Sequence, residues 1–232
     1  MAISAATLLN IWETGTTQAP VVRVLTLLTP LFPETPVAEL PIGMRDSLLL
    51  LVREWLLGTQ MDCVAVCPGC ATRVEFVVAT TALRALAPTI TEQQLTIGEQ
   101  QLAFRLPASI DLLALPRDSA ATRHLIERCL IEAPMTLSDE ILTAVVTAMT
   151  EADPLLDLRI ALNCPDCGHT WVAPFDVAGF VWQELDRWVR RLLRDVHSLA
   201  RAYGWKESAI LALSPQRRAL YLQMVNDERS VG

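Results

Sequence analysis

The sequence predicts a mainly α-helical protein with a small β-ribbon, an α+β fold. Two short cysteine hooks, Cys67-Pro68-Gly69-Cys70 and Cys164-Pro165-Asp166-Cys167, are each followed by a stretch with strand character. Between and after the hooks, apolar residues recur in steps of three and four, the spacing of a helix that buries one face. We therefore expect two ribbon halves separated by a β-hairpin and helical insertion, then a long C-terminal helix and a short helical hairpin.

Residues 1–58 are expected to form an N-terminal helical and Pro-rich segment. A short helix over 5–13 precedes an apolar segment over 21–28. The linker that follows should be extended and poorly suited to a core, because proline removes a backbone donor and disfavours helix in the preceding residue. Its prolines are Pro30, Pro33, Pro36 and Pro41.

A strong helix is predicted over residues 45–57. It should end at Gly58, since glycine is favoured just past a helix C-terminus. Its expected apolar positions are Leu48, Leu51, Val52, Trp55 and Leu56.

Residues 59–80 and 157–176 are expected to form the split ribbon, in which paired stretches flank each hook. Residues 61–66 and 73–78 flank the first hook, and 158–162 and 170–175 flank the second.

Residues 81–156 are the predicted insertion. The alternation over 95–105 around Gly98 indicates a hairpin. Helical spacing follows over 110–115, 120–131 and 139–151, with Ser138 as the N-cap of the third helix.

Residues 177–232 are predicted to be helical. A long helix over 177–203 carries a wide apolar face and an opposite face with several arginines, which we interpret as a solvated, salt-bridged surface. Gly204 should end it. Shorter helices are expected over 206–212 and 215–225, where Ser214 is a natural N-cap and Pro215 a natural first residue.

The two hooks predict a structural zinc site. Four thiolates in paired Cys-x-x-Cys spacing match a tetrahedral ion that prefers soft ligands at about 2.3 Å. We predict one structural zinc held by Cys67, Cys70, Cys164 and Cys167. A filled site of this kind leaves no position for an activated water, which disfavours catalytic zinc.

A redox site and disulfide bonds are the other roles open to the cysteines. A thioredoxin-like site needs a single hook that opens a helix, and six cysteines in 232 residues are sparse for a disulfide-stapled secreted domain. Residues 1–10 also lack the basic start of a signal peptide. Cys63 is interpreted as a buried small hydrophobe and Cys129 as core. Whether Cys63 or His169 contributes to the metal site stays open.

Charge and composition exclude some classes of binding partner. The net charge of −7 argues against general attraction to nucleic acid or an anionic membrane, although the segment from Asp176 onward carries +2 and the remainder −9. No apolar run approaches the roughly 18 residues that span a bilayer. The apolar content of 52% indicates a well-filled core or an additional surface that a partner covers.

The sequence contains no recognisable catalytic constellation. The Gly-x-Ser-x-Gly elbow, the phosphate-binding loop and the dinucleotide fingerprint are all absent, and the three histidines are dispersed. We therefore predict no catalytic residue, no organic cofactor site and no enzymatic activity.

Three parts of the sequence resemble a known family: the hooks, the helix over 180–185 and the segment 197–222. The last of these contains Tyr-Gly-Trp, Leu-Ser-Pro and an arginine pair. The chain resembles T4-type phage baseplate proteins and the baseplate hub assembly chaperone family of contractile tails and extracellular contractile injection systems. The resemblance is strong over about 60 C-terminal residues and moderate at the hooks.

The resemblance implies a non-enzymatic assembly factor or minor structural component of a baseplate, with hub, spike or wedge proteins as partners. It implies neither nucleic acid nor membrane as a partner, and it leaves self-association open. The expected location is the bacterial cytoplasm, and retention in the assembled particle is left open. A zinc-ribbon module that binds nucleic acid or a polymerase is the alternative, although few basic residues flank the hooks.

Overall fold

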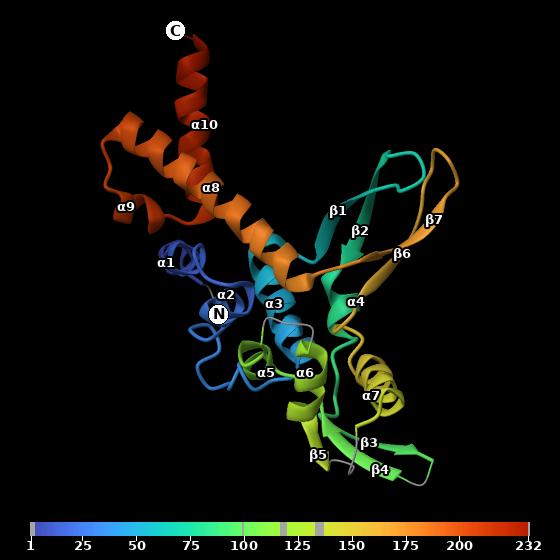
Figure 1. The fold of residues 1–232 in the computed structure, drawn as a ribbon. Coiled ribbons are helices and arrows are strands. Elements are labelled where there is room, and N and C mark those ends of the chain that lie inside the picture. The colour runs from blue at the N-terminus through green and yellow to red at the C-terminus, as the bar shows by residue number, and fades with distance from the viewer. Residues whose placement is uncertain (1–2, 99, 117–119, 133–136, 232) are drawn as a thin grey trace. The chain divides into compact units, whose positions relative to one another are not determined.

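Helices dominate the structure, and three small antiparallel sheets accompany them among the residues described (Figure 1). This computed structural model describes residues 3–98, 100–116, 120–132 and 137–231. Glu99 of the predicted hairpin and residues 117–119 and 133–136 of the predicted insertion therefore lie outside the described residues, as does Gly232. The α+β class expected from the sequence is confirmed.

The chain divides into two compact units. The terminal unit combines Met1–Leu31 with Val181–Gly232, and the central unit is Phe32–Phe180. Both predicted ribbon halves and the insertion belong to the central unit. The four-part division drawn from the sequence stays a prediction.

The terminal unit begins with two packed helices, α1 (Ala5–Gly15) and α2 (Pro20–Leu28). The Ser4 side chain accepts a hydrogen bond from the Thr7 N–H, which caps α1, and Pro20 occupies the first turn of α2, where its missing donor costs nothing. The apolar segment expected over 21–28 is thus a helix.

Helix α8 (Val177–Tyr203) follows the predicted bounds, and its part from Val181 onward belongs to the terminal unit. Gly204, with a φ of 67°, ends the helix in the left-handed region, which costs glycine little. Its buried positions recur in steps of three and four, as a one-sided helix requires. They are Val177, Val181, Leu185, Val189, Leu192, Val196 and Leu199.

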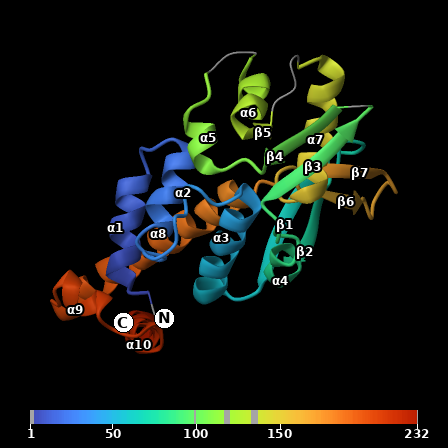
Figure 2. The same ribbon diagram turned by 90° about the horizontal axis from the view of Figure 1, so that it is seen from below.

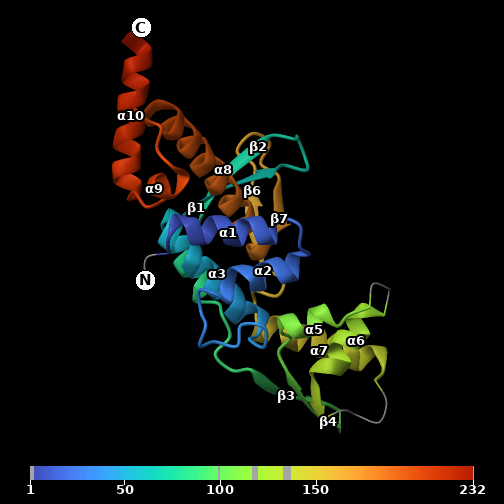
Figure 3. The same ribbon diagram turned by 90° about the vertical axis from the view of Figure 1, so that its left-hand side faces the viewer.

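Two further helices pack back on α8 (Figure 3). They are α9 (Glu207–Leu211) and α10 (Pro215–Val231), which is longer than the predicted 215–225. The Ser214 side chain accepts from the Arg217 N–H, as the predicted cap requires. Ile210 and Val225 share a small core with Leu199. Packing on the long helix therefore accounts for the buried side of the predicted helical hairpin.

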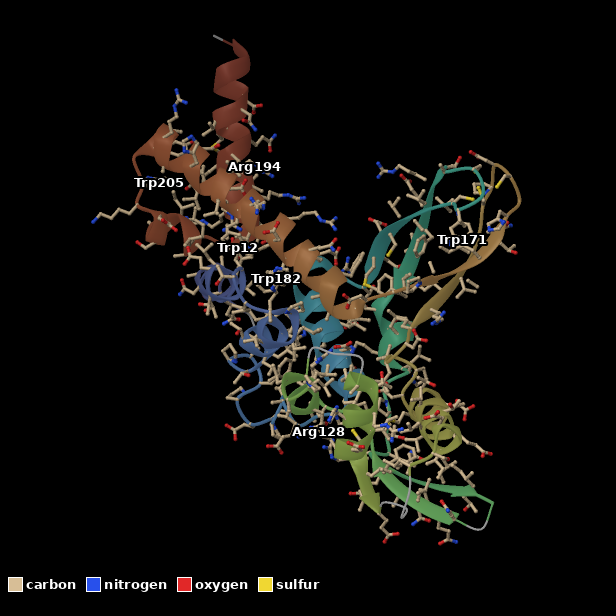
Figure 4. The ribbon with its side chains drawn as sticks, in the orientation of Figure 1. Trp12, Arg128, Trp171, Trp182, Arg194 and Trp205 are labelled. Atoms are coloured by element: carbon tan, nitrogen blue, oxygen red, sulfur yellow. The ribbon has the colours of Figure 1, made fainter. Side chains whose placement is uncertain are left out.

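Aromatic and charged contacts join α1 and α2 to α8 within the terminal unit (Figure 4). The Trp12 indole N–H donates to Asp186 at 2.9 Å. The Arg23 guanidinium lies 4.7 Å from the centre of the Trp182 ring, and a side chain at Gly15 would collide with the same ring. These contacts bring together two segments from opposite ends of the chain.

In the central unit, α3 (Ile42–Leu57) starts three residues before the prediction of 45–57. The Asp153 carboxylate accepts from the Gly43 N–H at 2.8 Å and so satisfies a donor in the first turn. Gly58, with a φ of 84°, ends the helix as expected.

The buried face of α3 differs from the predicted one. Leu49 and Leu50 are buried, whereas Trp55 is 41% exposed. Val52 is buried as predicted, but the buried face also includes Arg45 and Asp46, which form an ion pair. A prediction that places charges outside cannot anticipate this buried pair.

The predicted extended linker contributes to the central unit after residue 31. Val37 is buried, and the Ala38 carbonyl accepts from the Ile110 N–H. Pro41 forms an isolated bridge with Ala108, next to α5 (Ser109–Leu113). The linker therefore takes part in packing, contrary to the expectation that it suits a core poorly.

The insertion forms a three-stranded sheet packed with two helices (Figure 2). Its strands are β3 (Glu92–Ile97), β4 (Gln100–Arg105) and β5 (Leu130–Glu132), and its longer helices are α6 (Ala121–Cys129) and α7 (Asp139–Ala152). The Gly98 turn and the Ser138 cap are as predicted. The helix expected over 120–131 instead ends at Cys129, because Leu130 pairs with Phe104 of β4. Cys129 is fully buried in this core, as predicted.

Within the part of the chain that the structure covers, no helix is both long and apolar enough to cross a bilayer.

Candidate metal centre

Two antiparallel hairpins carry the cysteine hooks at their turns (Figure 1). The first is β1 (Gln60–Val66) with β2 (Arg73–Ala79), which leads into α4 (Thr80–Arg84), and the second is β6 (Arg159–Asn163) with β7 (Thr170–Pro174). The last pair of the first ladder is Val66 with Arg73, and that of the second is Asn163 with Thr170. Loops 67–72 and 164–169 therefore occupy equivalent places at the two hairpin ends.

The two loops have the same backbone hydrogen bonds. In the first, the Cys67 N–H donates to the Thr72 carbonyl at 2.9 Å, and in the second the Cys164 N–H donates to the His169 carbonyl at 2.9 Å. The Ala71 N–H likewise donates to Cys67, and the Gly168 N–H to Cys164. Each N–H thus points back into its own loop and holds the hook in a tight turn.

The fifth residue of each loop is left-handed. Gly168 has a φ of 71°, which is easy for glycine, but Ala71 has a φ of 62°. Ala71 is the one residue other than glycine with a positive φ among those the structure describes. The first loop therefore adopts the same left-handed conformation as the second, although the Ala71 side chain disfavours it.

The four predicted ligand atoms come together. The sulfurs of Cys67, Cys70, Cys164 and Cys167 all lie within 4.8 Å of one another. Across the hooks, Cys67 Sγ lies 3.7 Å from Cys167 Sγ, and Cys70 Sγ lies 3.6 Å from Cys164 Sγ. Figure 4 shows sulfur atoms gathered between the two loops.

These sulfur distances fit a metal tetrahedron. Four sulfurs at about 2.3 Å from a zinc ion lie roughly 3.8 Å apart, whereas disulfide-bonded sulfurs lie about 2.05 Å apart. The observed separations of 3.6 and 3.7 Å match the first spacing. Cys67 and Cys164 are buried, and Cys70 and Cys167 are exposed. The arrangement can hold one tetrahedral ion through two buried and two outer thiolates.

Side chains also cross from one hook to the other. The Thr72 hydroxyl donates to the Asp166 carboxylate at 2.8 Å. In the equivalent place on the other side, a Cβ on Gly69 would lie 3.3 Å from His169 Cβ, so His169 packs closely over a residue without a side chain. The His169 ring also stacks against Trp171, which Figure 4 labels on β7.

The thiols of the two outer cysteines differ in acidity. The adjacent Thr72 hydroxyl and the Thr72 backbone N–H lower the pKa of Cys70 to about 6. The backbone N–H of His169 acts to lower the pKa of Cys167, but its thiol neighbours, Cys70 first, outweigh it and raise this pKa to about 12. Cys70 is therefore the more acidic of the two outer thiols.

The remaining cysteine and histidine candidates lie outside this cluster. Cys63 is buried on β1, where its Sγ is 3.5 Å from the Met61 carbonyl oxygen. Among the described residues, the only group of metal-binding side chains that converges is the four hook cysteines, so neither Cys63 nor His169 joins it.

The sequence patterns did not identify Thr72 and Asp166 as part of the site. Aligning the hooks as Cys-Pro-x-Cys-x-x places Thr72 opposite His169 and Asp166 opposite Gly69. That alignment would have shown which positions are equivalent. It would not have shown that a sixth residue contacts the third residue of the other hook, because that contact depends on how the two hairpins meet.

The fold and the cluster define an α+β protein whose two distant hairpins meet at four cysteines. The chain matches the family described as T4 bacteriophage base plate protein over residues 6–182, and it belongs to this family. The expected T4-type baseplate family is thereby confirmed. No curated protein and no solved structure matches the chain.

The matched range includes both hooks, the insertion and the N-terminal segment. It ends before the segment 197–222, which carried most of the resemblance in the sequence. The membership therefore rests on the part of the chain that contains the cysteine cluster. As a member of this family, the protein is a phage baseplate component that interacts with other baseplate proteins.

Proposed function

We propose that the protein is a non-enzymatic assembly factor or minor structural component of the baseplate of a contractile phage tail or contractile injection system. The family match over residues 6–182 carries this proposal. The finer role is assistance in baseplate assembly in the bacterial cytoplasm, through contact with a hub, spike or wedge protein.

Exposed apolar side chains on the first hairpin support a role in protein contact. Val64, Val66 and Val77 lie on the outward face of β1 and β2 and are each about half exposed or more. In the strand register each of these three valines lies directly opposite a charged residue, which is Glu75, Arg73 and Asp62 respectively, so this face alternates apolar and charged side chains. Exposed apolar side chains flanked by charges suit contact with another protein.

We further propose that Cys67, Cys70, Cys164 and Cys167 hold one structural zinc ion. A hairpin of two strands is marginally stable in water, and here two such hairpins carry the four thiols. Metal binding would supply the missing stabilisation and join segments distant in the sequence. Zinc is favoured over harder cations because all four ligands are sulfur.

The zinc proposal is tested by metal analysis of the purified protein. Wild type should contain one zinc per chain, and Cys67→Ser or Cys164→Ser should lower the zinc content and the melting temperature. Cys129→Ala is the matched control, since this core cysteine is remote from the cluster and should leave zinc content unchanged. Full zinc occupancy with unchanged melting in both hook variants would contradict the proposal.

The baseplate role is tested by mass spectrometry of assembled particles together with pull-down of the tagged protein from producing cells. Stoichiometric presence in particles would identify a structural component. Absence from particles, with hub or spike proteins in the pull-down, would identify an assembly factor that leaves. Absence from particles and a pull-down without baseplate proteins, together with salt-sensitive nucleic-acid binding, would overturn the proposal in favour of the zinc-ribbon alternative.

A further inference from the structure

The two hooks are related by an approximate twofold arrangement. The cross-hook pair of Cys67 with Cys167 corresponds to that of Cys164 with Cys70, and the two distances agree within 0.1 Å. The backbone bonds that close each loop are also equivalent. The chemistry at the two crossing contacts, however, is different.

On one side the crossing contact is a hydrogen bond. Thr72 is held by its own loop, because its carbonyl accepts from the Cys67 N–H, and its hydroxyl donates to Asp166. Asp166 lies between Cys164 and Cys167. This bond therefore joins the two hooks through residues that are each fixed beside metal-binding thiols.

On the other side the crossing contact is packing. His169 lies against Gly69, and a methyl group there would also come within 3.5 Å of Cys167 Sγ. With no side chain at Gly69, no hydrogen bond equivalent to that of Thr72 can form. Among the residues described, Thr72 and Asp166 form the polar side-chain bond from hook to hook.

We infer that Thr72 and Asp166 are positioning residues for the metal, which fix the separation and orientation of the two hooks so that four thiolates meet at tetrahedral spacing. This inference rests on the proposed zinc site. Binding is tighter when ligands are held in place beforehand, because less ordering remains to be done when the ion arrives. Asp166 also places a carboxylate beside four thiolates, where like charges repel. The hydrogen bond donated by Thr72 stabilises this carboxylate.

The test measures Zn²⁺ affinity of the full chain by competition with a chromophoric chelator. Thr72→Val and Asp166→Ala should each weaken zinc binding about tenfold, the usual loss when a partner of the ligands is removed. The double variant should be no weaker than Thr72→Val alone, since that substitution already removes the bond to Asp166. Thr72→Ser and Asp166→Asn retain a hydroxyl donor and an oxygen acceptor and should stay close to wild type. Thr96→Val is the matched control, since Thr96 is an exposed threonine on β3 and lies in neither hook.

Two further measurements distinguish a positioning role from general destabilisation of the fold. Cobalt-loaded wild type should show the intense thiolate-to-cobalt absorption of a tetrahedral site, and the melting temperature of the metal-free protein should be the same for wild type and Thr72→Val. Equal zinc affinity in wild type, Thr72→Val and Asp166→Ala would overturn the inference while leaving the zinc site intact. A wild-type chain without thiolate-to-cobalt absorption would overturn the zinc proposal and this inference together.

Discussion

At the scale of single residues, the hooks carry strain in one loop and not in the other. Ala71 and Gly168 occupy equivalent left-handed positions. An L-residue in this region costs roughly 1–2 kcal/mol, and glycine avoids that cost while losing more chain entropy on folding. We expect Ala71→Gly to raise the free energy of unfolding by about 0.5–1 kcal/mol.

The reciprocal change at the equivalent position is a built-in control. Gly168→Ala should lower the free energy of unfolding by about 1 kcal/mol, because it introduces into the second loop the strain that the first already bears. Urea denaturation of the zinc-loaded protein measures both. Effects of the same sign in the two variants would contradict the equivalence of the loops.

A second residue-scale prediction concerns Asp46. Burial raises the pKa of Asp46 from 3.8 to about 6, despite the hydrogen bonds that it accepts from Arg45. An acid whose folded-state pKa is raised stabilises the fold fully below its unfolded pKa and loses that contribution as the pH rises through the folded value. Between pH 4 and pH 7.5 this contribution to the free energy of unfolding falls by about 2 kcal/mol, because at pH 4 the unfolded carboxyl is already more than half ionised.

Asp46→Asn removes the titration while retaining an oxygen that can accept from Arg45. The free energy of unfolding of the variant relative to wild type should therefore improve by about 2 kcal/mol between pH 4 and pH 7.5. Denaturant unfolding across this pH range measures the difference, in which the other titrating groups largely cancel. A difference between the two proteins that does not change with pH would show that Asp46 titrates normally.

At the scale of elements, periodicity predicted α8 to the residue because this helix obeys the rule that apolar side chains face inward. The same reasoning misplaced the buried face of α3, where Arg45 and Asp46 are paired inside. It also missed β5, since residues 130–132 become a strand only by pairing with β4. Local patterns thus predict elements whose burial follows hydropathy, and they fail where a distant partner decides.

The start of α3 provides an element-scale prediction. A Cβ on Gly43 would lie 2.0 Å from an Asp153 carboxylate oxygen, a contact that cannot exist without movement. Gly43→Ala should therefore displace the carboxylate that caps α3 and lower the free energy of unfolding by about 2–4 kcal/mol, through overpacking together with a lost cap. Ser47→Ala on the same helix is the control and should cost little. A loss below about 0.5 kcal/mol in Gly43→Ala would show that the cap tolerates displacement.

At the scale of the whole molecule, the four cysteines were predictable from spacing, because paired Cys-x-x-Cys hooks carry their chemistry in local sequence. The contact of Thr72 with Asp166 was not, since it arises only when two hairpins distant in the chain lie together. Two apolar cores lie away from the hook loops, one in the insertion and one among α8, α9 and α10. Among the described residues, the cluster at the hooks has three buried members, which are Cys67, Val74 and Cys164.

This distribution predicts that zinc removal acts locally. With so small an apolar core at the hooks, the paired hairpins should depend on the proposed metal for their stability, whereas the insertion and the terminal unit have cores of their own. Hydrogen exchange measured by mass spectrometry, with and without a strong zinc chelator, should show faster exchange in residues 60–79 and 159–174 after chelation. Exchange in α7 and in α8 from Val196 onward should change little, because these segments pack in the insertion core and in the core that α8 shares with α9 and α10. Equal acceleration throughout the chain would mean that the metal supports the whole fold, and unchanged exchange in the hairpins would mean that they are stable without it.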